Sequence, residues 1–435
     1  KFTRQKNQIK EKELPKKQKM EGKNLRNASI TNSETTSVHQ KSIDLNSNID
    51  FQNTKIAFAH HTNGELRKAS WLFRLMNNHR LVAYGSTWAL RLLKWNVPFV
   101  ETAIKKTIFA HFCGGTTLLN SMPAIEHLKK FNAKTILDYG VEAKQTEVDF
   151  NLTMNENIRA LDFAAKTGNI PFISIKITGL CRFELLERVQ AGTPLTAEEN
   201  QEYLFAFKRV DSICHVARDR KVSVMIDAEE SWIQDAIDRI ADEMMRRYNG
   251  EKVVVLNTFQ MYRHDRLEFL KQSFIKAQQK GYLLGAKLVR GAYMEKERKR
   301  AEEMRYATPI NPDKVATDQM YNDALLFCTS NYSKIMVCNA THNAQSSMLL
   351  AALMQEMGIK TGHPHFYFCQ LYGMSDNLTF NLAAAGYNVA KYLPYGSVKE
   401  VVPYLIRRAQ ENSTVTGDMS REHSLLKKEM QRRGI

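Results

Sequence analysis

The sequence predicts an α/β fold, a parallel (βα)8 TIM-like barrel preceded by helices, and three observations support this prediction. Eight short runs rich in β-branched and aromatic residues occur between residues 134 and 394, and longer helical patterns separate them. The runs are apolar without strict alternation, which is typical of strands buried on both faces. Eight such units over roughly 300 residues match the length of an eight-stranded barrel.

Residues 1–50 are predicted to form a disordered basic extension. Residues 1–30 carry 10 Lys and Arg against 3 Asp and Glu and have almost no large apolar side chains. The whole chain has a formal charge of +16, which leaves a nucleic-acid binder open as an alternative. We expect no nucleic-acid partner, because the chain lacks zinc spacing and a basic face interleaved with aromatic residues.

Residues 51–133 are predicted to form an N-terminal helical region. Four amphipathic patterns support it: SWLFRLM (70–76), TWALRLLKW (87–95), VETAIKKTIFAHF (100–112) and MPAIEHLKKF (122–131). Their Trp, Phe and Leu content favours packing on a core over contact with a membrane surface. No membrane span is expected, because Arg91 and Lys94 interrupt the best apolar candidate, residues 81–98.

Residues 134–435 are predicted to be the barrel domain. Its strands are expected at KTILDY (134–139), PFISIKI (171–177), KVSVMID (221–227), KVVVLN (252–257), LGAKLVR (284–290), KIMVCN (334–339), HFYFC (365–369) and VAKYLP (389–394). A helical pattern follows each run, such as residues 196–218 after the second. A doubly wound open sheet is the alternative, and it is disfavoured because no GxGxxG follows any of these strands.

The cysteines and histidines indicate a reduced protein without a structural metal. Six cysteines are scattered without a CxxC pair, which is typical of free thiols in a reducing compartment. We expect no signal peptide, because no apolar segment lies near residue 1. His363 and His365 are spaced like a metal pair, but this spacing is also ordinary in a strand, and no metal is predicted.

Polar residues follow almost every predicted strand. Since the carboxyl ends of barrel strands share one rim, we expect these side chains to gather there: Asp138, Glu142, Lys176, Asp227, Asn257, Gln260, Lys287, Arg290, Tyr293, Thr341, His342, Asn343, Gln370 and Tyr392, with Tyr404, Arg407, Arg408 and Glu411 on the last helix. Lysine inside an apolar strand is costly unless an anion meets it. The set is rich in donors and therefore suits a large anionic ligand and a small carboxylate.

Six motifs in order resemble the proline dehydrogenase family: IDAEES (226–231), KLVRGAYMEKER (287–298), TDQMYNDAL (317–325), ATHNA (340–344), QLYGMSDNLTFNLAAAGYNVAKYLPYG (370–396) and PYLIRRAQEN (403–412). The resemblance covers roughly residues 51–420. It implies a barrel enzyme with non-covalent FAD that oxidises L-proline to Δ1-pyrroline-5-carboxylate. It also implies that a membrane quinone accepts the electrons.

The resemblance also implies roles for individual residues. Arg407, Arg408 and Lys176 would hold the proline carboxylate, and Asp227 would lie near flavin and substrate. Tyr392, Tyr404 and Leu288 would surround the ring, and Glu142 would close over it by pairing with Arg407. The implied FAD contacts are Asn257, Gln260, Lys287, Val289, Tyr293, Thr341, His342, Gln370 and Glu411.

The expected setting is the inner face of a bacterial cell membrane, with the matrix side of the mitochondrial inner membrane as the alternative. A separate pyrroline-5-carboxylate dehydrogenase is expected to take the product. Two other activities remain open. One is hydroxyproline dehydrogenase, although that branch of the family carries a smaller residue at the position of Tyr392. The other is a Schiff-base aldolase with Lys176 or Lys287 as nucleophile.

Overall fold

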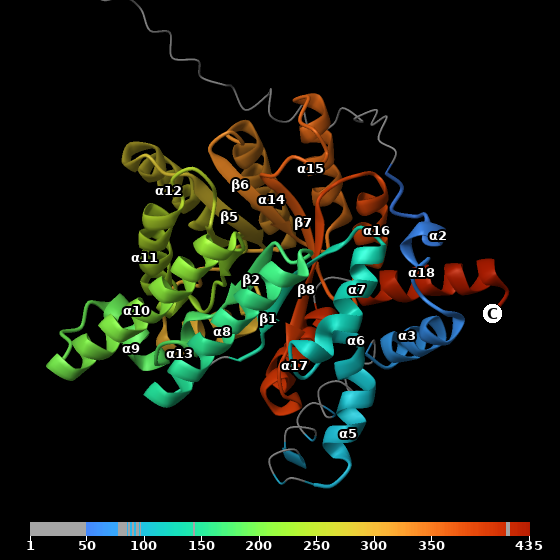
Figure 1. Cartoon of the computed structure of the whole chain (residues 1–435), viewed down its shortest axis with the longest axis horizontal. Helices are drawn as coiled ribbons and strands as arrows, with labels where there is room; N and C mark the ends of the chain where they lie inside the picture. Colours follow the sequence, from blue (N-terminus) through green and yellow to red (C-terminus); the bar gives the residue numbers. More distant parts are fainter. Residues whose placement is uncertain are drawn as a thin grey trace, which may run out of the picture. The chain divides into compact units, whose positions relative to one another are not determined.

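The computed structural model describes residues 49–76, 85, 88, 91–92, 95, 97–141, 144–414 and 418–435, the side chains of 409–414 and 418–419 excepted. Eight parallel strands close into a barrel in sequence order, and β8 pairs with β1 (Figure 1). The strands are β1 (Lys134–Tyr139), β2 (Phe172–Ile175), β3 (Ser223–Ile226), β4 (Val255–Gln260), β5 (Leu284–Val289), β6 (Ile335–Ala340), β7 (Phe366–Leu371) and β8 (Val389–Tyr395). The predicted fold class is confirmed.

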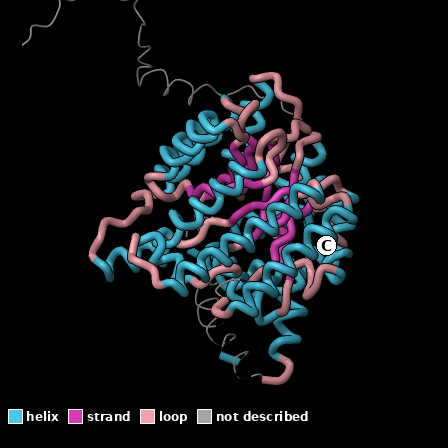
Figure 2. Tube along the Cα trace, turned by 60° about the vertical axis from the view of Figure 1, so that its left-hand side comes forward, coloured by secondary structure: helices cyan, strands magenta, loops and turns pink. Residues whose placement is uncertain are grey.

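Helices surround the strands (Figure 2). Those before the barrel are α2 (Thr54–Ala57), α3 (Asn63–Met76), α5 (Val100–Ile104), the π-helix η1 (Lys105–Phe109), α6 (Ala110–Phe112), the 3₁₀ helix η2 (Leu119–Ser121) and α7 (Met122–Lys130). Those of the barrel are α8 (Glu147–Thr167), η3 (Ile177–Gly179), α9 (Phe183–Ala191), α10 (Ala197–Arg220), α11 (Ser231–Tyr248), α12 (Arg266–Lys280), α13 (Met294–Met304), α14 (Lys314–Ser330), α15 (Ala344–Glu356), α16 (Asp376–Ala384), α17 (Val398–Thr414) and α18 (Asp418–Arg433).

Helix boundaries follow the capping residues in the sequence. At the start of α10, the Thr196 hydroxyl accepts a hydrogen bond from the Glu199 amide, and the Glu199 carboxylate accepts one from the Thr196 amide. At the start of α8, the Thr146 hydroxyl accepts a hydrogen bond from the Asp149 amide. Helix α8 ends at Gly168, whose φ of +73° suits a residue without Cβ. These local signals set where α10 begins and where α8 begins and ends.

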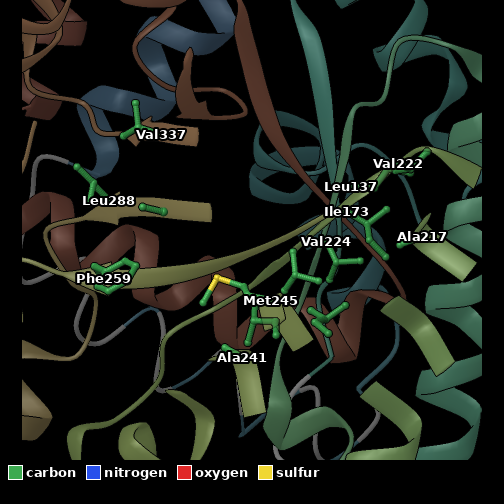
Figure 3. Packing of buried hydrophobic residues seen from close by; sticks show 14 of the residues in the cluster. Leu137, Ile173, Ala217, Val222, Val224, Ala241, Met245, Phe259, Leu288 and Val337 are labelled. Atoms are coloured by element: carbon green, nitrogen blue, oxygen red, sulfur yellow. The ribbon is translucent and has the colours of Figure 1, made fainter. Parts of the chain in front are cut away.

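Alternate strand residues face opposite sides of the barrel wall, and each side has its own apolar cluster. Outward side chains pack under the helices, among them Leu137, Ile173, Val224 and Phe259 (Figure 3). Inward side chains such as Ile136 fill the barrel interior. Strands buried on both faces account for the absence of strict alternation in the sequence.

Strand β4 begins three residues later than predicted, at Val255 rather than Lys252. The Asn249 side chain causes the shift, because its Oδ1 accepts the amides of Val254 and Val255 while its Nδ2 donates to the Val255 carbonyl. These bonds hold the chain in a turn before ladder pairing starts. The strand also continues three residues beyond its predicted end, to Gln260, so Asn257 lies within the strand and not at its end.

The N-terminal helices pack against the C-terminal helices. In Figure 1, α2 and α3 lie beside α18. The Arg433 guanidinium donates to the carbonyls of Phe58 (2.7 Å) and His61 (2.8 Å), and Asn377 on α16 donates to the Phe51 carbonyl (3.1 Å). Both ends of the described chain therefore support the same side of the barrel.

Within the described ranges, no helix has both the length and the apolar character that crossing a bilayer requires. Most of the apolar candidate at 81–98 lies outside those ranges. The predicted basic extension also lies outside them, apart from its last two residues.

Candidate active site

A cavity of about 560 Å³ lies at the carboxyl ends of the strands. Its walls come from nearly every part of the rim. The polar and aromatic residues that line it are Lys176, Asp227, Thr258, Gln260, Lys287, Arg290, Tyr293, Lys314, Thr341, His342, Asn343, Gln345, Gln370, Tyr392, Tyr404, Arg407, Arg408 and Arg421. Seven of these are Lys or Arg and one is an acid, so the cavity is strongly cationic.

Asp227, which follows β3, accepts hydrogen bonds from four side chains. Its Oδ1 accepts from the Ser174 hydroxyl (2.5 Å) and the Lys287 ammonium (2.6 Å). Its Oδ2 accepts from the Tyr392 hydroxyl (2.7 Å) and the Lys176 ammonium (3.1 Å). Because a carboxylate offers about four lone-pair positions, these donors saturate Asp227.

The charges around Asp227 keep it ionised. Burial by itself raises the pKa of Asp227, but the charges of Lys287 and Lys176 and the hydrogen bonds from Lys287 and Ser174 outweigh burial, and they hold the pKa well below its usual range. A carboxylate with saturated oxygens and a low pKa is a poor proton acceptor. Asp227 instead holds the two lysines in place.

Asp138, near the end of β1, is the second carboxyl group in this cluster. Its Oδ1 accepts a hydrogen bond from Lys176 Nζ at 3.3 Å. Its Oδ2 is buried and has no hydrogen-bond partner among the described residues. Burial raises the pKa of Asp138, and the positive charge of Lys176 offsets this only in part. One lysine thus lies between two carboxyl groups, and Asp138 takes up a proton more readily than Asp227.

Arginines from two parts of the rim add to the cationic wall. Arg290, after β5, donates to Asp318 (2.8 Å) and Thr341 (2.7 Å) and is fixed by them. Arg407 and Arg408 project from α17, and the Arg408 guanidinium lies 5.3 Å from the centre of the Tyr404 ring. These groups offer several donors to an anionic ligand.

His342 and Gln260 add polar groups without charge. Burial, together with the positive charges of Lys391, Arg408, Arg421 and Arg290, lowers the pKa of His342 to about 3, so the ring is neutral. Gln260 Nε2 donates to the Glu229 carbonyl (3.1 Å). This bond fixes the amide orientation and leaves Oε1 buried without a partner among the described residues.

Thirteen of the residues to which the resemblance assigns a role line this cavity. They are Lys176, Asp227, Gln260, Lys287, Val289, Tyr293, Thr341, His342, Gln370, Tyr392, Tyr404, Arg407 and Arg408. Glu142 lies outside the described residues, and so does the side chain of Glu411. The implied pairing of Glu142 with Arg407 and the implied FAD contact of Glu411 therefore stay predictions.

Two of the expected positions are wrong. Asn257 faces outward from β4 and donates to Asp238 on α11 (2.9 Å), because the true strand boundary reverses its expected role as a strand-end residue. Leu288 also faces outward, since its neighbours Lys287 and Val289 face the cavity and side chains alternate along a strand. It belongs to the apolar layer under the helices (Figure 3).

Two of the cationic residues that line the cavity were not anticipated from the sequence. Arg421 comes from α18, after the last barrel helix, and donates to the His342 carbonyl at 2.8 Å. Lys314 begins α14 and forms an ion pair with Asp318. Neither residue directly follows a strand. The expectation that residues after a strand lie at the rim therefore did not identify them.

The loop between β7 and α16 forms part of the rim, and buried polar groups hold it. Asp376 Oδ2 contacts the Nε2 atoms of His60 (3.2 Å) and His61 (3.1 Å), and its Oδ1 lies 2.7 Å from Lys391 Nζ. Glu422 on α18 accepts the Ser375 amide (2.5 Å). Segments from before and after the barrel therefore fix this loop jointly.

The fold and this cavity define a (βα)8-barrel protein with a cation-lined cavity at the carboxyl-terminal rim. The chain belongs to the proline dehydrogenase family, because the sequence model of that family, described as proline dehydrogenase, matches residues 121–421. Mitochondrial proline dehydrogenase 1 of Arabidopsis thaliana is 32% identical over 375 residues, which cover 76% of this chain and 75% of that protein.

Hydroxyproline dehydrogenase of Xenopus laevis is 32% identical over 368 residues, covering 77% of this chain and 79% of that one. The crystal structure of proline utilization A from Bdellovibrio bacteriovorus, inactivated by N-propargylglycine, superposes with a TM-score of 0.66 at 20% identity. That likeness covers 84% of this chain but 38% of the other, so the chain spans little more than a third of its length, and the likeness bears on the fold alone.

Proposed function

We propose that this protein is a proline dehydrogenase that oxidises L-proline to Δ1-pyrroline-5-carboxylate with FAD as its cofactor. The observation that carries the proposal is that Lys176, Arg407 and Arg408 line the same cavity as Tyr392 and Tyr404. A small amino acid with an anionic carboxylate and an apolar ring needs this combination. The family membership of the chain supports the same reaction.

The carboxylate of proline would bind to the cations and its ring to the aromatic groups. Two guanidiniums and an ammonium can donate several charge-assisted hydrogen bonds to one carboxylate. Tyr392 is anchored through its hydroxyl to Asp227, so its ring position is fixed. Closure of Glu142 over the substrate by pairing with Arg407 remains part of the proposal.

The residues of the cavity fit a flavin dinucleotide. The orphaned Oε1 of Gln260 is an acceptor that a flavin N–H group would satisfy. Arg290, Lys314 and Arg421 are cations suited to a pyrophosphate. The proposed contacts are Gln260, Lys287, Val289, Tyr293, Thr341, His342 and Gln370, with Glu411 added from the resemblance.

The protein side chains would bind and orient the substrate. Bound FAD would supply the acceptor for the hydride that leaves C5 of proline. The amine of proline must be neutral before the hydride leaves. The cationic wall favours this neutral form, because it repels the positive charge of the protonated amine. Starting from the neutral amine, loss of the C5 hydride and of the single N–H proton, which water would accept, would yield the cyclic imine.

The two alternatives fit the cavity less well. A Schiff-base aldolase needs a lysine amine that is free to attack a carbonyl, whereas Lys176 and Lys287 are both held in ion pairs with Asp227. Hydroxyproline needs room for an added hydroxyl, whereas the large Tyr392 is buried and held in place. Proline is therefore the preferred substrate.

The electron acceptor and the setting are also proposals. We propose that a membrane quinone reoxidises the flavin and that a separate pyrroline-5-carboxylate dehydrogenase takes the product. The proposed location is the inner face of a bacterial membrane or the matrix side of the mitochondrial inner membrane. The barrel of residues 134–435 would be the catalytic domain, with residues 51–133 as a helical region.

Anaerobic absorption spectroscopy tests the proposal. The purified protein should show the visible bands of oxidised flavin, and these bands should bleach on addition of L-proline. Pyrrolidine, which has the ring without the carboxylate, is the matched control and should bleach them far more slowly. A flavin that L-proline leaves oxidised would refute the substrate, and a protein that cannot bind FAD would refute the cofactor.

A further inference from the structure

Four charged groups form a line of alternating sign across the rim. Asp138, Lys176, Asp227 and Lys287 follow one another with contacts of 3.3, 3.1 and 2.6 Å. All four are largely buried. Such a line is stable only while the positive and negative charges balance, because an unpaired buried charge is costly.

The two carboxyl groups in this line are not equivalent. Asp227 has two lysines, a serine and a tyrosine as donors. Asp138 has Lys176 on Oδ1, and its Oδ2 has no partner among the described residues. Loss of Lys176 would thus leave Asp227 well compensated and would leave Asp138 as a buried, uncompensated anion.

Lys176 also faces the cavity. A ligand carboxylate that reaches this ammonium would be the third carboxyl group around it. The ligand would then compete with Asp138, since Asp227 is already saturated. The other ionisable groups facing Asp138 are Tyr392 and Tyr395 of β8 and Cys113 before β1. None of these three can supply a positive charge in place of Lys176.

We propose that Asp138 is a positioning residue that controls, through Lys176, how tightly the cavity binds a ligand carboxylate, and that Asp138 takes up a proton when the carboxylate binds. The proposal rests on the proposed function, because it assumes a carboxylate substrate. A proton on Asp138 removes the negative charge that competes with the ligand for Lys176. The neutral carboxyl group also costs less free energy to bury than the carboxylate. Burial already raises the pKa of Asp138 in the free protein, which supports this response.

The sign of the pH dependence follows from linkage. The carboxylate binds better to protein with a protonated Asp138, so binding raises the pKa of this group further. The affinity for the carboxylate is then highest at pH values below the pKa that Asp138 has in the ligand-free protein. Above that value the affinity falls as pH rises, by up to about tenfold per pH unit, until the pH reaches the higher pKa that Asp138 has in the ligand complex. Proton uptake on binding is greatest within the same window.

Isothermal titration calorimetry of the flavin-loaded protein tests the proposal. The probe is tetrahydrofuran-2-carboxylate, in which a ring oxygen replaces the amine so that no imine can form. Titrations in two buffers of different ionisation enthalpy should show net proton uptake by the wild-type protein. Tetrahydrofuran-2-carboxamide, the neutral analogue, should show none.

The variant Asp138→Asn keeps the shape and an oxygen acceptor for Lys176 but removes the charge. It should lose the proton uptake and most of the pH dependence, and it should bind the carboxylate at least about tenfold more tightly than wild type at alkaline pH. Asp238→Asn is the matched control, since Asp238 is also a buried carboxyl paired with a cation, Arg266, but lies outside the cavity. This control should bind the probe like wild type.

The outcomes separate this inference from the proposed function. If the wild-type protein carries flavin but does not bind the probe, the carboxylate site itself is refuted, and this inference with it. If the wild-type protein binds the probe without proton uptake, the proposed role of Asp138 is refuted and the carboxylate site of the proposed function stands. This result does not depend on whether the variant folds. Weaker binding by Asp138→Asn with an unchanged pH profile would also refute it and would leave Asp138 a purely structural group.

Discussion

Replacement of Asp227 by Asn should destabilise the protein strongly, because two buried lysines share this carboxylate. Lys287 and Lys176 are within 2.6 and 3.1 Å of it, and their side chains are 7% and 9% exposed. Removing one partner of a buried ion pair costs about 3–5 kcal/mol. The amide can still accept from Lys287 through its oxygen, but its NH2 group would face Lys176, a second donor. We therefore expect a loss of about 4 kcal/mol in the free energy of unfolding.

Urea unfolding of the cofactor-free protein measures this loss, because bound ligand would add its own stabilisation. The effect should also have a definite pH profile. The pKa of Asp227 is lowered in the folded protein, so its contribution is fully present above the unfolded pKa of about 3.9 and is lost as pH falls through the folded value. The difference between wild type and variant should thus stay constant from neutral pH down to about pH 4. A variant within about 1 kcal/mol of wild type at neutral pH would refute the reasoning.

Three other changes test separate parts of the site. Arg407→Met should lose nearly all proline turnover and keep bound flavin, and steady-state kinetics with the flavin spectrum would show this; unchanged turnover and KM would contradict the carboxylate assignment. Tyr392→Ser should lower kcat/KM for proline and raise the relative rate with 4-hydroxyproline, and an unaltered preference would remove the argument for proline. Glu422→Gln should stabilise the protein at alkaline pH. The pKa of Glu422 is raised from 4.5 to about 7, so wild-type stability falls as pH rises through that range, by about 3 kcal/mol in all. Denaturant midpoints from pH 5 to pH 8 measure the difference, and parallel curves for variant and wild type would contradict it.

The strands and most of the rim could be predicted because their signals are local. A buried parallel strand is a short apolar run, and the residue after it lies at the rim by geometry alone, as Asp227 and Lys176 do. Asn257 could not be placed correctly, because β4 continues past it to Gln260 and side-chain alternation directs Asn257 outward to Asp238. A boundary error of this size moves a residue from the rim into the strand.

Leu288 and Arg421 show two other limits of the sequence. Leu288 lies between two cavity residues, so its direction depends on strand alternation, which a motif does not reveal. Arg421 reaches the cavity from a helix that packs beyond the barrel, and no periodicity in the sequence states where that helix lies. Long-range packing, rather than local preference, determines both positions.

The loop between β7 and α16 has a consequence for the order in which the protein matures during synthesis. His60 and His61 leave the ribosome long before Asp376, and Glu422 leaves it last. A nascent chain can therefore complete all eight strands while this part of the rim still lacks its partner on α18. The barrel can form first, and the rim of the cavity takes its final shape only when the C-terminal helix has docked.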